Sequence, residues 1–169
     1  QADAQVLSLL NSRYVPNFKP REEEGYIRLT THNAMAQQIN NAELEKLPGQ
    51  TYMFKAVVEG KFPELSFPTD EVLELKKNAQ VMFVKNDSSP EKRYYNGMIG
   101  RVTAINERGF VVQPKGTNET IEVAPEEWEN NRYELDEQTK EIKEVREGLF
   151  RQYPVKTAWA ITIHECKVN

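Results

Sequence analysis

Short apolar runs and alternating apolar and polar positions predict mainly β-strands along most of this chain. Residues 1–25 are rich in proline and charge and are expected to form a lead-in segment. Residues 26–31 (YIRLTT) predict a strand, and the next stretch, HNAMAQQINNAELEKLPG, has apolar residues near helical spacing. Its helix is expected to end at Pro48-Gly49 and to be capped by Thr31 or Asn33.

From Thr51 the pattern predicts short strands separated by turns. Residues 51–60 (TYMFKAVVEG) alternate and predict one strand, and residues 71–87 predict two strands around a turn at Lys77-Asn78. The second of these, QVMFV, is fully apolar. Asn96-Gly97 is a strong tight-turn signal, and residues 109–114 and 120–128 predict further strands. Strands of this length and spacing favour a small barrel or sandwich.

The last third of the chain predicts a charged hairpin and a final buried strand. Residues 131–155 are expected to turn near Gln138-Thr139, and residues 158–163 (AWAITI) are expected to lie beside the strand at 26–31. The predicted fold class is therefore α+β and mainly β, with an all-β insert in an α/β unit.

Charge and composition narrow the functional classes only slightly. The formal net charge of -4 argues against a protein that coats nucleic acid. Residues 76–101 nevertheless carry six basic residues against two acids, whereas residues 107–147 carry twelve acids against six bases. One face could meet a polyanion, although a solvated surface of mixed sign is the commoner explanation. No apolar run approaches the roughly 20 residues of a membrane helix, and the single cysteine fits a cytoplasmic protein.

Signatures of a complete enzyme are absent from the sequence. It contains no G-x-x-x-x-G-K-[ST] phosphate loop, no G-x-G-x-x-G and no Cys/His cluster with metal spacing. Two polar loops remain as candidate sites. Thr31 and Asn33 precede a helix, where free N–H groups favour phosphate, although simple helix capping would also explain them. Thr162 and His164 follow a strand predicted to be parallel, where ligands often bind, although a core Thr and a surface His are equally plausible.

Three ordered stretches resemble superfamily 1 DNA helicases of the Pif/RecD group. IRLTTHNAMAQQIN is similar to their motif IV region, and LKKNAQVMFVKND with YYNGMIGRVTAI is similar to their barrel insert. YPVKTAWAITIH resembles the strand of their motif V. The resemblance implies an SH3-like barrel at residues 70–125, inserted into a partial second RecA-like domain formed by residues 26–69 and 126–169 with the charged hairpin.

The resemblance also implies single-stranded DNA as the partner. The residues it implies as DNA contacts are Thr31, Asn33, Asn96, Gly97, Thr162, His164 and, more weakly, Lys85. The intact family uses ATP and Mg²⁺, whereas no cofactor is expected for this chain. Binding by the isolated chain is expected to be weak, and an exposed sheet edge is expected to invite self-association.

The chain departs from the family pattern after His164. The family continues as HKSQG, whereas here HECKVN follows, and the ATP-binding first domain is missing from the sequence. We therefore expect a helicase fragment that is inactive alone, whether excised, proteolytic or encoded by a gene with a frameshift, and the altered ending favours the frameshift. The alternative is a stand-alone SH3-like module that binds a protein or peptide.

Overall fold

The computed structural model describes residues 27–162, and this part is α+β with little helix, as predicted. It contains helix α2 (Asn33–Lys46) and a 3-10 turn, η2 (Glu64–Ser66). None of its helices is long and apolar enough to cross a membrane. The strands are β1 (Arg28–Thr30), β2 (Tyr52–Lys55), β3 (Val57–Gly60), β4 (Val72–Leu75), β5 (Gln80–Phe83), β6 (Ile99–Asn106), β7 (Gly109–Pro114), β8 (Ile121–Glu122), β9 (Glu126–Leu135), β10 (Ile142–Gln152), β11 (Val155–Thr157) and β12 (Ala160–Thr162).

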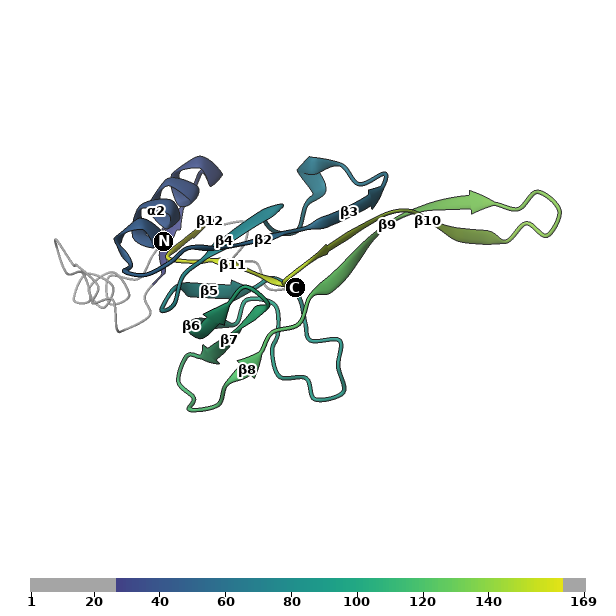
Figure 1. Cartoon of the computed structure of the whole chain (residues 1–169). Coiled ribbons are helices and arrows are strands. Elements are labelled where there is room, and N and C mark those ends of the chain that lie inside the picture. Colours follow the sequence, from purple (N-terminus) through teal and green to yellow (C-terminus); the bar gives the residue numbers. More distant parts are fainter. Residues whose placement is uncertain (1–26, 163–169) are drawn as a thin grey trace, which may run out of the picture.

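The strands form four sheets in this part of the chain. An antiparallel sheet of five strands has the order β11-β5-β6-β7-β8, and a second antiparallel sheet has the order β3-β10-β9. β2 pairs with β4, and β1 pairs with β12. Figure 1 shows α2 beside the β1–β12 pair at one end of the molecule. The five-stranded sheet lies below β2 and β4, and the β9–β10 hairpin extends from the opposite end.

Strand β5 is apolar from Val81 to Phe83 because it is covered on both faces. All four of its residues are buried. Val81 and Phe83 belong to the main core with Leu73, whereas Met82 belongs to a second, smaller core with Ile161. Because alternate side chains of a strand point to opposite faces, β5 separates the two cores. A strand covered on both faces cannot show an alternating pattern.

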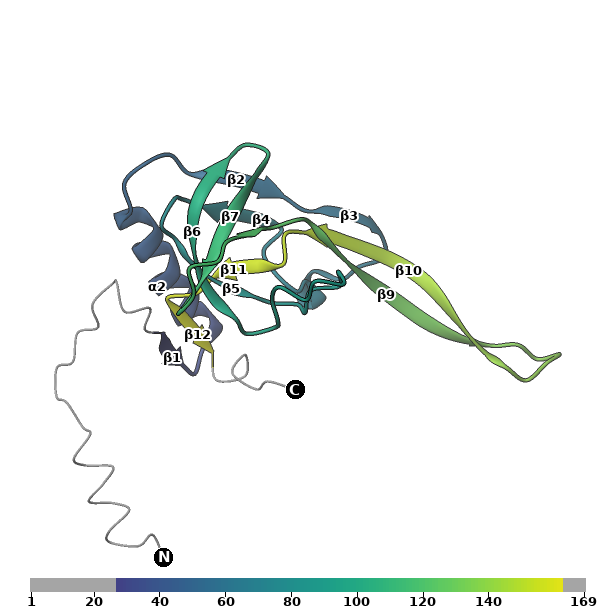
Figure 2. The same cartoon turned by 90° about the horizontal axis from the view of Figure 1, so that it is seen from below.

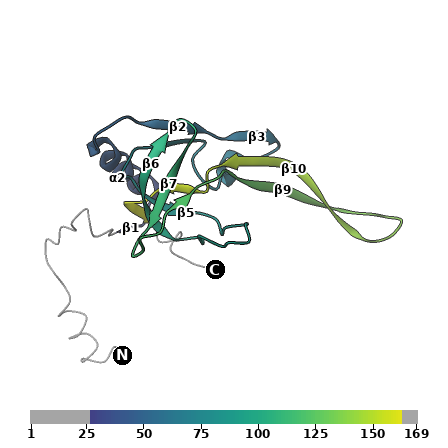
Figure 3. The ribbon, with the colours of Figure 1, turned by 60° about the horizontal axis from the view of Figure 1, so that its bottom comes forward.

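The predicted charged hairpin is confirmed as a long two-stranded arm formed by β9 and β10. The two strands pair from Ile142↔Leu135 to Gln152↔Glu126, with one irregularity between Arg146 and Gly148. Figures 2 and 3 show the distal part of the arm projecting away from the rest of the molecule. Both faces of this distal part meet solvent, which accounts for its dense charge.

Two predicted strands are interrupted, because each changes partner along its length. The single strand predicted at residues 51–60 was wrong, since β2 pairs with β4, β3 pairs with β10, and Ala56 between them donates its N–H to the Glu71 carbonyl. The strand predicted at residues 158–163 begins only at Ala160. Ala158 instead pairs with Gln80, through both the backbone and the side chain of Gln80, where the chain passes from β11 to β12.

The prediction that the last strand lies beside the first strand is confirmed. β1 and β12 run parallel, with Arg28 opposite Ala160 and Thr30 opposite Thr162. Helix α2 follows β1 and packs against this pair. The first strand, the helix and the last strand thus form one α/β unit, although more than 110 residues separate α2 from β12 in the sequence.

Candidate functional site

The carboxyl ends of β1 and β12 meet at one edge, which is where ligands bind in parallel α/β sheets. Next to this edge lies a pocket of about 190 Å³ whose lining includes Asn33 and Thr162. The fold therefore brings together two of the residues named from the sequence, one from each polar loop. Asn33 is exposed, whereas Thr162 is only 2% exposed, so the two present very different areas to a ligand.

The start of α2 lacks the cap that the sequence predicted. The capping position is occupied by His32, which makes no side-chain cap bond, and the first turn contains no acidic residue. The Thr31 hydroxyl instead contacts His32 Nδ1 at 2.8 Å, and the buried Thr30 hydroxyl donates to the His32 carbonyl at 3.1 Å. Capping by Thr31 or Asn33 was therefore wrong. The first turn of α2 therefore supplies no carboxylate of its own to the positive end of the helix dipole, where an anion can bind.

Two opposite charges line the same pocket, on Asp70 and Lys156. Although Asp70 is an exposed residue, desolvation of its carboxyl raises its pKa, and Lys156 acts in the opposite direction. The two charges largely cancel. The pocket is thus polar and close to neutral, which favours a few hydrogen bonds to an anion over strong electrostatic attraction.

Asn40 is a residue of this region that sequence reasoning missed. Its Oδ1 accepts from the backbone N–H of Trp159 at 2.9 Å and of Ala160 at 2.8 Å, and its Nδ2 donates to the Ala160 carbonyl at 2.9 Å. A signal was present in the sequence, because Asn40 stands four residues from each of Ala36 and Leu44, the buried residues of α2. A polar residue in register with a buried helix face usually has a specific partner.

Lys85, a weaker candidate for DNA contact, is held by the base of the arm. Its Nζ donates to the Glu127 carbonyl, lies 3.6 Å from a carboxylate oxygen of Glu126, and stands 5.0 Å from the centre of the Trp128 ring. These contacts join the loop after β5 to the start of β9. Several other basic residues of residues 76–101 also bond within the chain, namely Lys76, Lys92 and Arg93. The basic stretch is therefore largely engaged in structural contacts.

The turn at Asn96-Gly97 precedes β6 and does not line the pocket. Met98 N–H donates to the Tyr95 carbonyl at 3.0 Å across this turn, and Gly97 has φ 96°. A positive φ at this position is the reason for glycine. Asn86 Oδ1 accepts from the Asn96 N–H at 2.8 Å and links the turn to the preceding loop.

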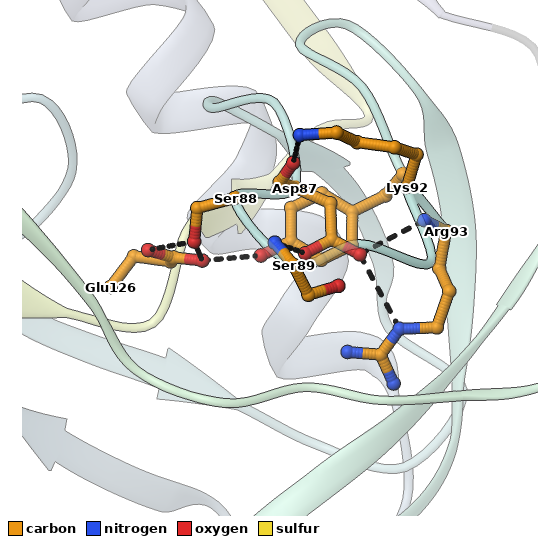
Figure 4. A network of polar contacts seen from close by, with 7 residues as sticks. Asp87, Ser88, Ser89, Lys92, Arg93 and Glu126 are labelled. Atoms are coloured by element: carbon orange, nitrogen blue, oxygen red, sulfur yellow. Dashed lines mark hydrogen bonds and ion pairs between the residues drawn. The ribbon is translucent and has the colours of Figure 1, made fainter.

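Asp87 organises that preceding loop. One carboxylate oxygen accepts from the Ser89 N–H at 2.9 Å, and the other accepts from the Arg93 N–H at 2.9 Å. Figure 4 shows this network together with Glu126, which accepts hydrogen bonds from Ser88 and from the neighbouring Tyr94. Asp87 is 2% exposed. The network therefore fixes the loop that ends in the Asn96-Gly97 turn and joins it to β9.

The hydrogen bonds of Asp87 predict a dependence of stability on pH. Burial alone would raise the pKa of its carboxyl, but the N–H donors of Ser89 and Arg93 outweigh burial and lower the pKa from 3.8 to about 2. A lowered pKa means that the stabilisation is complete above about pH 4 and is lost as the pH falls through about 2. We expect the free energy of urea unfolding to fall across this window.

The matched variant for this prediction is Asp87→Asn. It should lower the free energy of unfolding at neutral pH by about 1–3 kcal/mol, the usual range for losing a charged acceptor. Its further loss between about pH 4 and pH 2 should be smaller than that of the wild type. Identical pH profiles for the two proteins would show that Asp87 is not the titrating group.

His164, which the resemblance also implies as a DNA contact, lies outside the described residues. Among residues 27–162, no group of three or more His, Cys, Asp or Glu side chains could hold a metal ion. The sequence contains no G-x-x-x-x-G-K-[ST] phosphate loop, and we assign no residue of the chain to ATP or Mg²⁺.

Comparison with known proteins gives the chain a family context. No protein-family model matches it. The ATP-dependent DNA helicase PIF1 of Xenopus laevis is 27% identical over 155 residues, which cover 85% of this chain and 22% of that protein. The Bacteroides sp Pif1 structure in complex with ADP-AlF4 superposes with a TM-score of 0.85 at 34% identity, covering 98% of this chain and 37% of that one.

A second structure of the Bacteroides protein, bound to ssDNA, has a TM-score of 0.74 at 35% identity and covers 96% of this chain and 36% of that one. The matched part spans 12% to 39% of the length of the curated relatives, so the chain covers less than half of each of them. The likeness extends over the parallel strand pair, the five-stranded sheet and the arm, because it covers nearly all of the chain. The chain therefore corresponds to a C-terminal portion of a Pif1-like superfamily 1 helicase.

Proposed function

We propose that this chain binds the backbone of single-stranded DNA at the edge where β1 and β12 end. The observation that carries the proposal is the pocket shared by Asn33 and Thr162 beside the start of α2, which has no side-chain cap from His32 and no acidic residue in its first turn. An exposed amide and free helix N–H groups suit the oxygens of a phosphate diester. The related Bacteroides Pif1 structure bound to ssDNA supports the choice of ligand.

Within this proposal the named residues have unequal roles. Thr31 and Asn33 are exposed and provide the main contacts, whereas the nearly buried Thr162 mainly shapes the inner wall of the pocket. Lys156 supplies a positive charge, and Asp70 offsets it. Asn96 and Gly97 form a separate point of contact with the DNA strand. The near-neutral pocket is why we expect the isolated chain to bind weakly.

We also propose how the chain is divided into domains. Residues 70–125 form an SH3-like barrel inserted into a partial second RecA-like domain, residues 26–69 and 126–169, whose α/β unit is formed by β1, α2 and β12. The antiparallel order of β5 to β8 supports the barrel, and the parallel β1–β12 pair supports the RecA-like part. Strands on both sides of the insert also pair with it, because β2 joins β4 and β11 joins β5.

Binding of a fluorescent oligo-dT tests the proposal. With one phosphate neutralised by Lys156, the affinity should fall about fivefold when salt rises tenfold, because each such contact with single-stranded DNA contributes about -0.7 to the logarithmic slope. Asn33→Ala should weaken binding about tenfold at low salt, the cost of one hydrogen bond to a charged group. Anisotropy titrations at several salt concentrations measure both effects.

Asn118→Ala is the matched control, because Asn118 is an exposed asparagine in the loop between β7 and β8. It should leave the affinity unchanged. Absence of binding by the wild-type chain at low salt would contradict the proposal. If a peptide or protein then bound to the five-stranded sheet, the alternative of a stand-alone binding module would take its place.

A further inference from the structure

We propose that Asn40 is a positioning residue, which holds β12 in register with α2 and so sets the distance between Asn33 and Thr162 across the pocket. This inference rests on the proposed DNA site, because its functional consequence is measured there. Asn40 also lines that pocket, but its amide is directed to the backbone of β12.

The hydrogen bonds of Asn40 lie at the edge of β12 that faces away from β1. Arg28 N–H of β1 donates to the Trp159 carbonyl at 2.9 Å. Because successive residues of a strand direct their backbone groups to opposite edges, the N–H and C=O of Ala160 are directed away from β1. Within the described residues, β12 pairs only with β1. Asn40 bonds to both of these Ala160 groups, at 2.8 and 2.9 Å.

The backbone groups of Ala160 that Asn40 binds belong to a buried strand. Ala160 and Thr162 are 1% and 2% exposed, so water cannot readily replace the amide of Asn40 at this strand. The outer edge of β12 is therefore partly covered at Ala160. A three-point contact between one side chain and one backbone segment fixes both the distance and the register of the two elements.

The position of Asn40 on α2 also determines where Asn33 lies. Asn33 and Asn40 are seven residues apart in α2, which is nearly two turns, so they lie on the same face of the helix. Thr162 lies two residues beyond Ala160 in β12. One contact at Asn40 thus ties the element that carries Asn33 to the element that carries Thr162. Binding sites tolerate displacements of only about 0.5 Å in such pairs.

A double-mutant cycle separates positioning from simple stabilisation. Asn40→Ala should weaken oligo-dT binding about tenfold at low salt, and the double variant with Asn33→Ala should bind about as weakly as either single variant, because both remove the same arranged contact. A purely structural role predicts independent effects whose fold-changes multiply. Gln38→Ala is the control, because Gln38 is an exposed residue of the same helix outside the pocket lining.

Amide hydrogen exchange tests the inference independently of DNA. Asn40→Ala should accelerate exchange at Trp159 and Ala160 at least about tenfold and should shift the Thr162 resonances. Asn40→Asp keeps the acceptor for both N–H groups, so it should restore slow exchange if Asn40→Ala folds poorly. If wild-type protein binds no DNA but these changes occur, the DNA site fails and the register role stands. Unchanged Thr162 resonances in Asn40→Ala, or multiplying effects in the cycle, would overturn the inference.

Discussion

Replacing Phe150 by alanine should lower the free energy of unfolding by about 3–5 kcal/mol, the range for removing a fully buried phenylalanine. Phe150 is 0% exposed and lies at the centre of an aromatic cluster. Its ring centroid is 4.7 Å from that of Phe67, 5.6 Å from that of Phe62 and 5.9 Å from that of Trp128. Alanine would leave a cavity where the loop after β3, the start of β9 and β10 meet.

Urea unfolding measures this loss, and Tyr133→Ala provides the control. Tyr133 lies on the distal part of the same arm and is 72% exposed, so its removal should change the free energy by no more than about 0.5 kcal/mol. A loss below about 1 kcal/mol for Phe150→Ala would mean that the arm is not anchored through this cluster.

Gly148→Ala should have the second largest effect, about 3 kcal/mol of destabilisation from overpacking against backbone. Gly148 of β10 lies opposite Gly60 of β3. A Cβ atom on Gly148 would overlap the backbone of Lys61, which is part of the main chain and cannot rotate away as a side chain could. The pairing of β3 with β10 would have to open locally.

Gly109→Ala is the matched control for this second prediction. A Cβ at Gly109 would meet only the Tyr153 hydroxyl at an ordinary 3.5 Å, so its cost should stay near that of a surface change, within about 0.5 kcal/mol. Thermal or urea unfolding compares the two variants. Equal stability of Gly148→Ala and Gly109→Ala would show that β3 and β10 are not as close as the structure places them.

The parts of the fold that local sequence dictates were predicted well. The buried strand β5, the turn at Lys77-Asn78 and the hairpin turn near Gln138-Thr139 depend on neighbouring residues, and all are present. The position of β12 beside β1 was predicted because the chain opens with a strand and a helix and returns to a buried strand after the all-β part. These features needed only the hydrophobic pattern and turn chemistry.

The features missed by prediction depend on partners far away in the sequence. The residues 51–60 split into β2 and β3 because each half meets a different strand, β4 or β10. The helical spacing marks Asn40 as a polar residue on a buried face, but its partners lie 119 and 120 positions later and no local pattern identifies them. The absence of a side-chain cap on α2 likewise reflects a hydroxyl of Thr31 that contacts the His32 ring instead.

Hydrogen bonds and ion pairs within the chain also change the interpretation of the basic residues between Lys76 and Arg101. Six basic residues between Lys76 and Arg101 suggested a face for a polyanion. In the structure Lys85 holds the base of the arm and Arg93 pairs with Asp87, so contacts within the chain use much of that charge. The proposed DNA site lies instead at the opposite end of the molecule from the arm, beside α2 and β12.

The most direct test of the central claim is an NMR titration of the chain with a short oligo-dT at low salt. Backbone resonances report which residues meet the strand without requiring any variant. We predict the largest shifts at Thr31, Asn33 and Lys156, smaller ones at Asn96 and Gly97, and none at the tip of the arm. No shifts at all, or shifts confined to residues remote from the β1–β12 edge such as Asn118, would contradict a DNA site at that edge.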